Sequence, residues 1–239
     1  IRVIMRLTDV MNELETYGNE QTKRIFLNHG AREPFFGVKV ADLKKILKKI
    51  KKQQQLALDL YQTGNSDAMY LAGLAVNPKE MSESLIRDWA DKAYWYMLSE
   101  YTVAWVAAES AYGHSLALEW MESDNEHLAA CGWSTYSNLL ALKADEELDL
   151  SEIRSLLKKI EETIHSEKNR VRYTMNGFVL SVAAYVLPLL DDAKHVGEMI
   201  GHVQVEMGKT ACKVPFAPDY IKNLEVRGRI GKKKKTVRC

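Results

Sequence analysis

Apolar residues recur every three or four positions along almost the whole chain, which is the spacing of one face of an α-helix. In segment 40–50, for example, Val40, Leu43, Ile46 and Ile50 share one face, and lysines occupy the opposite face. No run alternates with period two for long enough to predict a strand. Caps, glycines and prolines divide the pattern into predicted helices at 8–18, 19–30, 40–50, 54–64, 66–77, 82–96, 101–113, 114–123, 125–143, 151–166, 169–187 and 191–207.

Short links join these helices, and such links favour antiparallel neighbours. So many helices in series are typical of an all-α superhelix of stacked antiparallel pairs, HEAT-like or armadillo-type, with a concave face. We predict one repeat domain over residues 5–208 and a basic C-terminal tail over 209–239, in a monomeric protein. The expected helix N-caps are Thr8, Asn19, Ser66 and Ser151, and further helices are expected to begin at Ser82 and Asn125.

Composition narrows the possible cofactors and locations. No stretch of about 18 consecutive apolar residues occurs, so we expect no membrane partner. The cysteines Cys131, Cys212 and Cys239 form no CxxC pair, and the six histidines are scattered. We therefore expect no metal site, no cofactor and a cytoplasmic location.

Charge is distributed unevenly along the chain, although the net charge is only +1. Residues 209–239 hold ten Lys and Arg against two acidic residues, a net charge of +8, so the rest of the chain carries −7. A second basic segment, 39–52, holds seven lysines and one aspartate. Clustered positive charge is typical of proteins that bind polyanions, and lysine-rich helix faces are also common on solvated surfaces.

The segment SEYTVAWVAAES at residues 99–110 places two aromatic rings and one carboxylate on a single helix face. Tyr101, Trp105 and Glu109 are spaced four residues apart and therefore lie above one another. This arrangement suits a site for a charged base or sugar, and it equally suits the inner face of a packed helix. The pattern alone leaves both interpretations open.

Four segments carry a resemblance to a known family: FFGVKVADLKKILKKI at 35–50, the aromatic helix from Tyr101, SDNEHLAACGW at 123–133, and NRVRYTMNGFVL at 169–180. Their order and spacing resemble the DNA alkylation repair family, the alkylpurine DNA glycosylases built from HEAT-like repeats. The resemblance spans about residues 20–205 and implies that fold, with DNA as the partner. The segment from Cys212 onward resembles the end of a separate branch of paralogues.

The resemblance also implies where an active site would lie. Active members carry a tryptophan and, one turn later, an aspartate that can stabilise the oxocarbenium-like sugar when a cationic alkylpurine leaves. When the helix is placed by its closing Gly113, these positions fall on Tyr101 and Trp105. The family's arginine falls on Ala130 and its second aromatic residue on Phe178. Both charged residues are absent, so we expect a divergent paralogue without a catalytic residue.

Another carboxylate could replace the missing aspartate, and Glu109 is a weak candidate. It lies one turn beyond Trp105, about 6 Å along the helix axis. We expect instead that Trp105 is buried and closes the cleft, that Tyr101 and Phe178 pack beside it, and that Glu109 is solvated or paired with a cation.

Three functions follow from these observations. The favoured one is a DNA-binding protein without glycosylase activity that contacts backbone phosphates. The alternatives are a monofunctional glycosylase for N3- or N7-alkylated purines, acting in base excision repair, and a protein-interaction scaffold. Lysines of segment 44–52 that point into the concave face would favour DNA, and an outward orientation would favour the scaffold. The candidate DNA contacts are Lys44, Lys45, Lys48, Lys49, Lys168, Arg170, Arg172, Lys232, Lys233, Lys234 and Lys235.

The C-terminal segment has two possible arrangements. Lys232 to Lys235 follow Gly228 and Gly231 with few apolar residues nearby, which predicts a mobile segment that follows a phosphate backbone. The alternative is a segment packed on the body through its apolar residues, namely Val214, Phe216, Tyr220, Ile221, Leu224, Ile230 and Val237.

Overall fold

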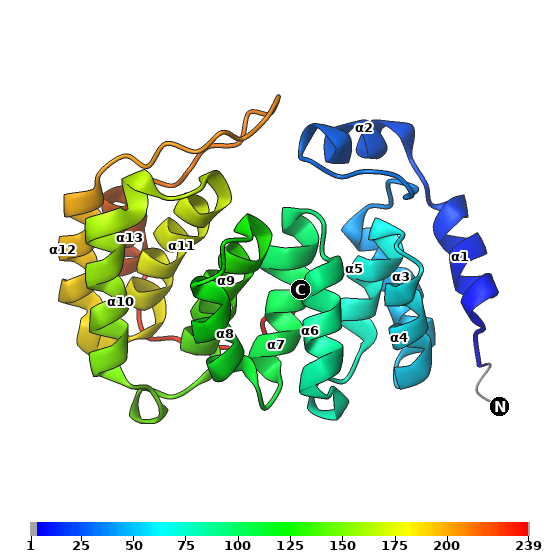
Figure 1. The fold of residues 1–239 in the computed structure, drawn as a ribbon, viewed down its shortest axis with the longest axis horizontal. Coiled ribbons are helices and arrows are strands. Elements are labelled where there is room, and N and C mark those ends of the chain that lie inside the picture. Colours follow the sequence, from blue (N-terminus) through cyan, green and yellow to red (C-terminus); the bar gives the residue numbers. More distant parts are fainter. Residues whose placement is uncertain (1–3, 239) are drawn as a thin grey trace.

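The computed structural model describes residues 4–238, and every regular element in that range is helical. The helices stack side by side from α1 at one end to α12 at the other (Figure 1). The chain then turns back, and its C-terminal end lies near the middle of the stack (Figure 1). The predicted all-α class is confirmed.

One row of helices runs through the whole stack, each helix in contact with the next, and we call it the inner row. It comprises α5 (Ser66–Ala75), η2 (Met97–Val103) with α7 (Ala104–Glu109), α9 (Glu126–Leu142), α11 (Asn169–Tyr185) and α13 (Ala217–Val226). A second row covers one side of it: α4 (Gln54–Gln62), α6 (Glu83–Lys92), α8 (Gly113–Met121), α10 (Leu150–Thr163) and α12 (Leu190–Ile200).

The N-terminal end of the stack is closed by α1 (Leu7–Thr16), α2 (Glu20–Asn28) and α3 (Val40–Ile50). Single 3₁₀ turns lie between the longer helices at η1 (Pro78–Glu80), η3 (Asp145–Glu147), η4 (Ile164–Ser166) and η5 (Leu187–Leu189).

Helix starts differ from the predicted ones where an earlier side chain is the better cap. Asn65 accepts hydrogen bonds from the N–H groups two and three residues later, so Ser66 lies inside α5. Asp149 caps α10 by accepting from the Glu152 N–H at 3.0 Å, and Ser151 lies inside that helix. Asparagine and aspartate side chains carry an acceptor oxygen that reaches these N–H groups. The predicted cap Thr8 is also wrong, because α1 begins at Leu7 with Arg6 as its N-cap. The cap at Asn19 and the helix starts at Ser82 and Asn125 are confirmed.

The predicted helix at 191–207 is too long, because α12 ends at Ile200 and Gly201 follows with φ of +57°. Residues 201–216 form an extended segment that crosses the start of α11. There the Asn169 side chain donates to the Glu206 carbonyl at 2.9 Å and accepts from the Glu206 N–H at 2.7 Å. The following helix, α13, was not predicted, and its buried residues Ala217 and Ile221 pack on α11 and α12.

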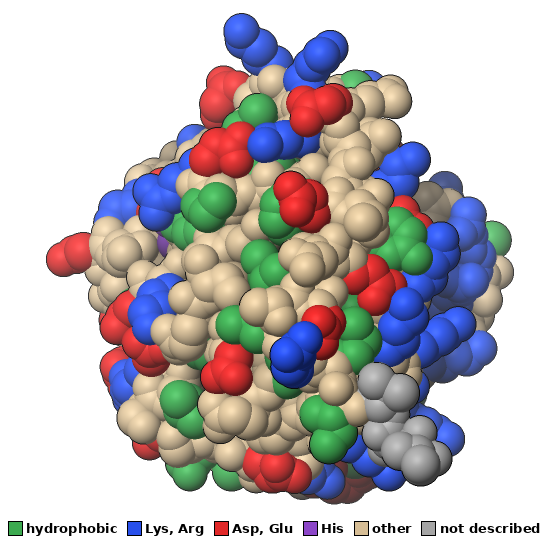
Figure 2. Space-filling view, turned by 90° about the vertical axis from the view of Figure 1, so that its right-hand side faces the viewer, with side chains coloured by type: hydrophobic (Ala, Val, Ile, Leu, Met, Phe, Trp, Pro, Cys, Tyr) green, Lys and Arg blue, Asp and Glu red, His purple; other side chains and the backbone are tan. Residues whose placement is uncertain are grey.

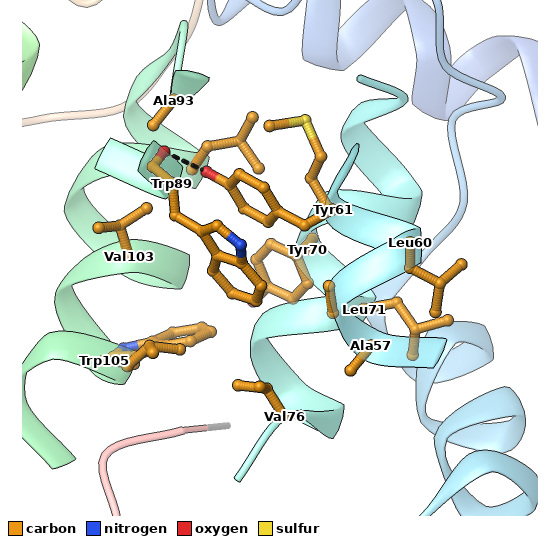
Figure 3. Packing of buried hydrophobic residues seen from close by; sticks show 14 of the residues in the cluster. Ala57, Leu60, Tyr61, Tyr70, Leu71, Val76, Trp89, Ala93, Val103 and Trp105 are labelled. Atoms are coloured by element: carbon orange, nitrogen blue, oxygen red, sulfur yellow. Dashed lines mark hydrogen bonds between the residues drawn. The ribbon is translucent and has the colours of Figure 1, made fainter. Parts of the chain in front are cut away.

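The interior divides into two apolar cores that meet at α9. The N-terminal core is organised by Tyr61 and Trp89, whose rings stack with centroids 3.9 Å apart. The Tyr61 hydroxyl donates to the Trp89 carbonyl at 2.6 Å (Figure 3). In the C-terminal core, Trp133 of α9 lies edge-on to Phe178 of α11 at 5.3 Å.

Between the two cores, η2 is wound as a π-helix and packs tightly on α5. A Cβ atom added at Gly73 would lie 2.5 Å from Cγ2 of Thr102, so only glycine permits this approach. The wider π-helical turn changes the side-chain register, and the residues in it include Glu100, which is 5% exposed.

Glu100 forms a buried ion pair with Arg170 at the start of α11. Two parallel hydrogen bonds of 2.7 and 2.6 Å join the guanidinium to the carboxylate. The side chains are only 12% exposed for Arg170 and 3% exposed for Glu100. The guanidinium carbon also lies 4.4 Å from the Tyr96 ring centroid and 4.3 Å from that of Tyr173. This cluster joins the N-terminal half of the inner row to the C-terminal half.

The C-terminal segment is docked, so the expectation of a mobile segment is wrong. Backbone N–H groups of Gly231 and Lys234 donate to carbonyls of α11 and α9 at 2.8 and 2.7 Å. Arg238 donates to the Val76 carbonyl at 2.6 Å and pairs with Glu109 at 2.9 Å. Val237 is buried in the N-terminal core. The segment therefore ties α5, α7, α9 and α11 together, and the division at residue 208 stays a prediction based on composition.

Removing one member of the buried pair should cost more than removing an exposed ion pair. In Arg170→Ala the Glu100 carboxylate stays buried without its partner, which should lower the free energy of unfolding by about 3–5 kcal/mol. The control Lys158→Ala breaks the exposed pair of Lys158 with Glu162 and should change that free energy by less than about 0.5 kcal/mol. Urea denaturation measures both. Equally small changes would contradict a structural role for the buried pair.

The docked C-terminal segment predicts a stability effect for Arg238. The Arg238→Ala variant loses its hydrogen bonds to Val76 and Glu109 and should be destabilised by about 1–3 kcal/mol. Lys232→Ala alters an exposed side chain of the same segment and should leave stability unchanged. Thermal unfolding of both variants tests this expectation, and unchanged melting of Arg238→Ala would support a mobile tail instead.

Candidate nucleic-acid interface

A cavity of about 380 Å³ opens on the exposed face of the inner row. Its walls come from η2 with α7, from α9, from α11 and from α13. The aromatic side chains that line it are Tyr101, Trp105, Tyr173 and Tyr220. The polar lining residues are Glu100, Ser134, Ser137, Asn138, Thr174 and Ser181, with Gly177 among them.

The lining residues of α9 and α11 were not predicted, although the sequence carries a signal for them. Tyr173, Gly177 and Ser181 follow one another at a spacing of four, and so do Ser134 and Asn138. Residues with this spacing share one helix face. They interrupt helices that are otherwise largely buried and apolar, so each helix turns a narrow polar stripe toward the cavity.

Trp105 lies at the junction of the cavity and the N-terminal core. It is 4% exposed, and its ring lies edge-on to Tyr70 at 5.5 Å and to Tyr101 at 5.7 Å. Figure 3 shows Trp105 on α7 close to Tyr70 on α5. The expectation that Phe178 packs beside Trp105 is wrong, because Phe178 points into the C-terminal core and contacts Trp133.

Neither Ala130 nor Glu109 supplies a free charge to the cavity. Ala130 is completely buried. Glu109 does not line the cavity, and its carboxylate accepts hydrogen bonds from Thr236, from the Val237 N–H at 2.9 Å and from Arg238. The expected cation partner of Glu109 is therefore present, and the carboxylate lies outside the cavity.

The cavity is close to neutral despite the carboxylate in its wall. Burial raises the pKa of Glu100, and the Arg170 guanidinium opposes that rise. The bidentate ion pair balances the two charges. Burial also raises the pKa of Tyr101 and Tyr173 and brings that of Tyr96 to about 12, so their hydroxyls are neutral near pH 7. The interpretation of Arg170 as a free phosphate contact is accordingly wrong.

The lysines of α3 face the N-terminal end of the stack. Lys45 pairs with Asp42 at 2.7 Å, and Lys49 pairs with Glu13 of α1 at 2.6 Å. Lys44 and Lys48 are exposed. Figure 2 faces this end of the molecule and shows Lys and Arg side chains gathered along one edge of it. None of the four lines the cavity, and this orientation on its own favours a scaffold.

The remaining candidate cations lie near the two ends of α11. At its start, Lys168 donates to the Asp124 carbonyl, and half-buried Arg172 donates to Asn169 at 3.5 Å. At its other end, Lys234 lies 5.7 Å from the Tyr185 ring centroid. Lys233 pairs with Asp145 at 2.8 Å, whereas the side chains of Lys232 and Lys235 are exposed.

Within residues 4–238, no single helix is long and apolar enough to cross a membrane. Helix α11 and residues 187–200 meet the length and composition only together, as a pair bent by 118°. In the same residues, no group of three or more His, Cys, Asp or Glu side chains is arranged to hold a metal ion.

Comparisons with known proteins agree with this architecture. Residues 10–190 match the model of the DNA alkylation repair enzyme family. Two uncharacterized proteins, Lin0241 of Listeria innocua and Lmo0209 of Listeria monocytogenes, are each 35% identical over 221 residues, which cover 90% of this chain and 95% of the relative.

A solved structure is 41% identical and matches with a TM-score of 0.90, over 98% of this chain and 100% of that one. It is described as a new family of proteins related to the HEAT-like repeat DNA glycosylases with affinity for branched DNA structures. The predicted HEAT-like fold is thereby confirmed. The chain belongs to the DNA alkylation repair enzyme family.

Proposed function

We propose that this protein binds branched DNA on the exposed face of the inner row and does not excise bases. The observation that carries the proposal is the likeness, over nearly the whole chain, to a structure described as having affinity for branched DNA. At 41% identity and a TM-score of 0.90, the two chains have the same helices available for contacting DNA.

The distribution of charge along α11 supports this location. The middle of the helix forms the neutral floor of the cavity, and cations lie toward both of its ends. Arg172 lies at its start, where the 201–216 segment with the exposed Lys209 and Lys213 crosses it through Glu206. Lys232 and Lys235 follow Gly231, whose N–H donates to the Ala184 carbonyl near the other end. A helix of 17 residues is roughly 25 Å long. Phosphates can therefore contact two separate basic edges while bases or sugars face the neutral floor.

The chemistry of the cavity supports the absence of base excision. Loss of an alkylpurine leaves a cationic sugar that needs a nearby anion, and Trp105 stands where the family carries that aspartate. The carboxylate in the cavity wall, Glu100, is already paired with Arg170. The neutral cavity offers aromatic and hydroxyl contacts and no free anion.

Base release is therefore expected to stay at the uncatalysed rate. The measurement is a single-turnover assay with protein in excess over methylated duplex DNA, in which 3-methyladenine and 7-methylguanine should remain attached to the sugar. Any release clearly faster than in a protein-free control would contradict the proposal and restore the glycosylase interpretation.

Binding should depend on DNA shape and on the lysines beside α11. A three-way junction should bind on the order of 10-fold more tightly than a duplex of the same length, a difference of about 1.4 kcal/mol. In a fluorescence anisotropy titration at several salt concentrations, the double variant Lys232→Ala with Lys235→Ala should flatten the log–log slope by about 2 units. The matched double variant Lys44→Ala with Lys48→Ala, on the end of the stack, should leave that slope nearly unchanged.

Equal affinity for junction and duplex would refute the preference for branched DNA. Absence of DNA binding would instead support the protein-interaction scaffold, to which the outward orientation of the α3 lysines already points. If only the α3 variant changed the slope, the DNA-binding face would have to be moved to the end of the stack.

A further inference from the structure

We propose that the cavity of the inner row seats one unpaired nucleobase from the branch point of the DNA. This inference rests on the proposed function and assigns the cavity a specific part of the substrate. At a branch, bases can leave the stack at lower cost than in a continuous duplex, because their pairing and stacking are already disrupted. Protein sites that receive such bases combine stacking on aromatic rings with hydrogen bonds to base edges.

The charges of the cavity exclude a phosphate as its occupant. Among the residues that the structure describes, Glu100 is the one charged residue in the lining, and Arg170 neutralises it through two hydrogen bonds. None of the described lysines or arginines lines the cavity. A neutral planar group fits this environment, whereas a phosphate would lose its hydration without gaining a cation. The volume, about 380 Å³, lies within the range of roughly 300–1,000 Å³ that is typical of small-ligand sites.

The lining side chains present both kinds of contact that a base needs. Tyr220 leaves 43% of its surface exposed at the cavity, although it is a large aromatic residue. Among the described residues, no hydrogen-bond partner is found for the side chains of Tyr220, Asn138, Ser134 or Ser181. Asn138 carries both a donor and an acceptor on one amide, which is what the hydrogen-bonding edge of a base requires.

The floor of the cavity is open because of a glycine. A Cβ atom added at Gly177 would meet no other atom within 4 Å. Glycine within a helix is therefore not required here by close packing, and it costs about 1 kcal/mol of helix stability relative to alanine. Its effect is to leave space between α9 and α11, beside Tyr173. A larger residue at this position would fill the cavity without disturbing either core.

One wall of the cavity is specific to the C-terminal part of this chain. Tyr220 belongs to α13, whereas the family model matches residues 10–190 only. The proposed base-binding cavity therefore has walls from inner-row helices within residues 10–190 and one aromatic residue, Tyr220, that lies C-terminal to that range. The proposal accordingly depends most on Tyr220, which can be changed without touching the buried side chains of the cores.

The test compares two three-way junctions that differ only at one unpaired nucleotide in the branch point. One carries adenine there, and the other carries an abasic tetrahydrofuran. Wild-type protein should bind the adenine junction roughly 5- to 100-fold more tightly, the factor expected for stacking of one base on an aromatic side chain. Tyr220→Ala and Gly177→Leu should each reduce the ratio of the two affinities to about one.

The control Val226→Ala alters a residue that is 79% exposed on the same helix and does not line the cavity. It should keep the full preference for adenine. Thermal unfolding of each variant verifies that it is folded, and Gly177→Leu is expected to be at least as stable as the wild type because leucine favours the helix.

Three results would overturn the proposal. Equal affinity of wild-type protein for the adenine and abasic junctions, with junctions still preferred over duplex, would refute the base-binding cavity and leave the proposed function intact. Equal affinity of the wild-type protein for junctions and for duplex would refute both the base-binding cavity and the proposed function. Free deoxyadenosine has the same base chemistry and should bind more weakly than about 1 mM. Micromolar binding that Tyr220→Ala abolishes would assign the cavity to a free nucleoside instead.

Discussion

The bidentate contact between Glu100 and Arg170 determines how the two halves of the molecule meet. It joins the π-helical segment η2 to the start of α11 and lies between the rings of Tyr96 and Tyr173. Because both charges are buried, each requires the other. Because Glu100 and Arg170 neutralise each other, neither charge is free to interact with a ligand in the adjacent cavity. The ion pair that joins the two halves therefore also makes the cavity neutral.

The absence of a free charge in the cavity affects base binding and base excision differently. An active glycosylase site needs an anion close to the sugar from which the base departs, and we propose that this cavity offers none. Trp105 packs on Tyr70 and Tyr101 and contributes to the N-terminal core. In the proposed function, the aromatic rings and hydroxyl groups that face the cavity bind a neutral base. On this account, the family's architecture is used for recognition of DNA structure.

Local features of the fold could be predicted from the sequence, and distant pairings could not. The spacing of residues such as Leu43 and Ile46 and the caps at Asn19 and Ser82 are properties of short segments, so they predicted the helices. Arg170 contacts a residue 70 positions earlier, and Arg238 contacts one 129 positions earlier. Neither pairing leaves a periodic signal. The lysine-rich segments were recognised from composition, which does not show that Lys45 and Lys49 already have carboxylate partners.

The central claim is that DNA contacts the exposed face of the inner row. Hydrogen–deuterium exchange of the protein with and without a three-way junction tests it most directly, because slowed exchange maps the contacted elements. The account predicts slower exchange at α13, at residues 201–216 and at the C-terminal segment from Gly231, with no change in α4, α6, α8 and α10. Slower exchange confined to α1 and α3, or to the second row of helices, would contradict it.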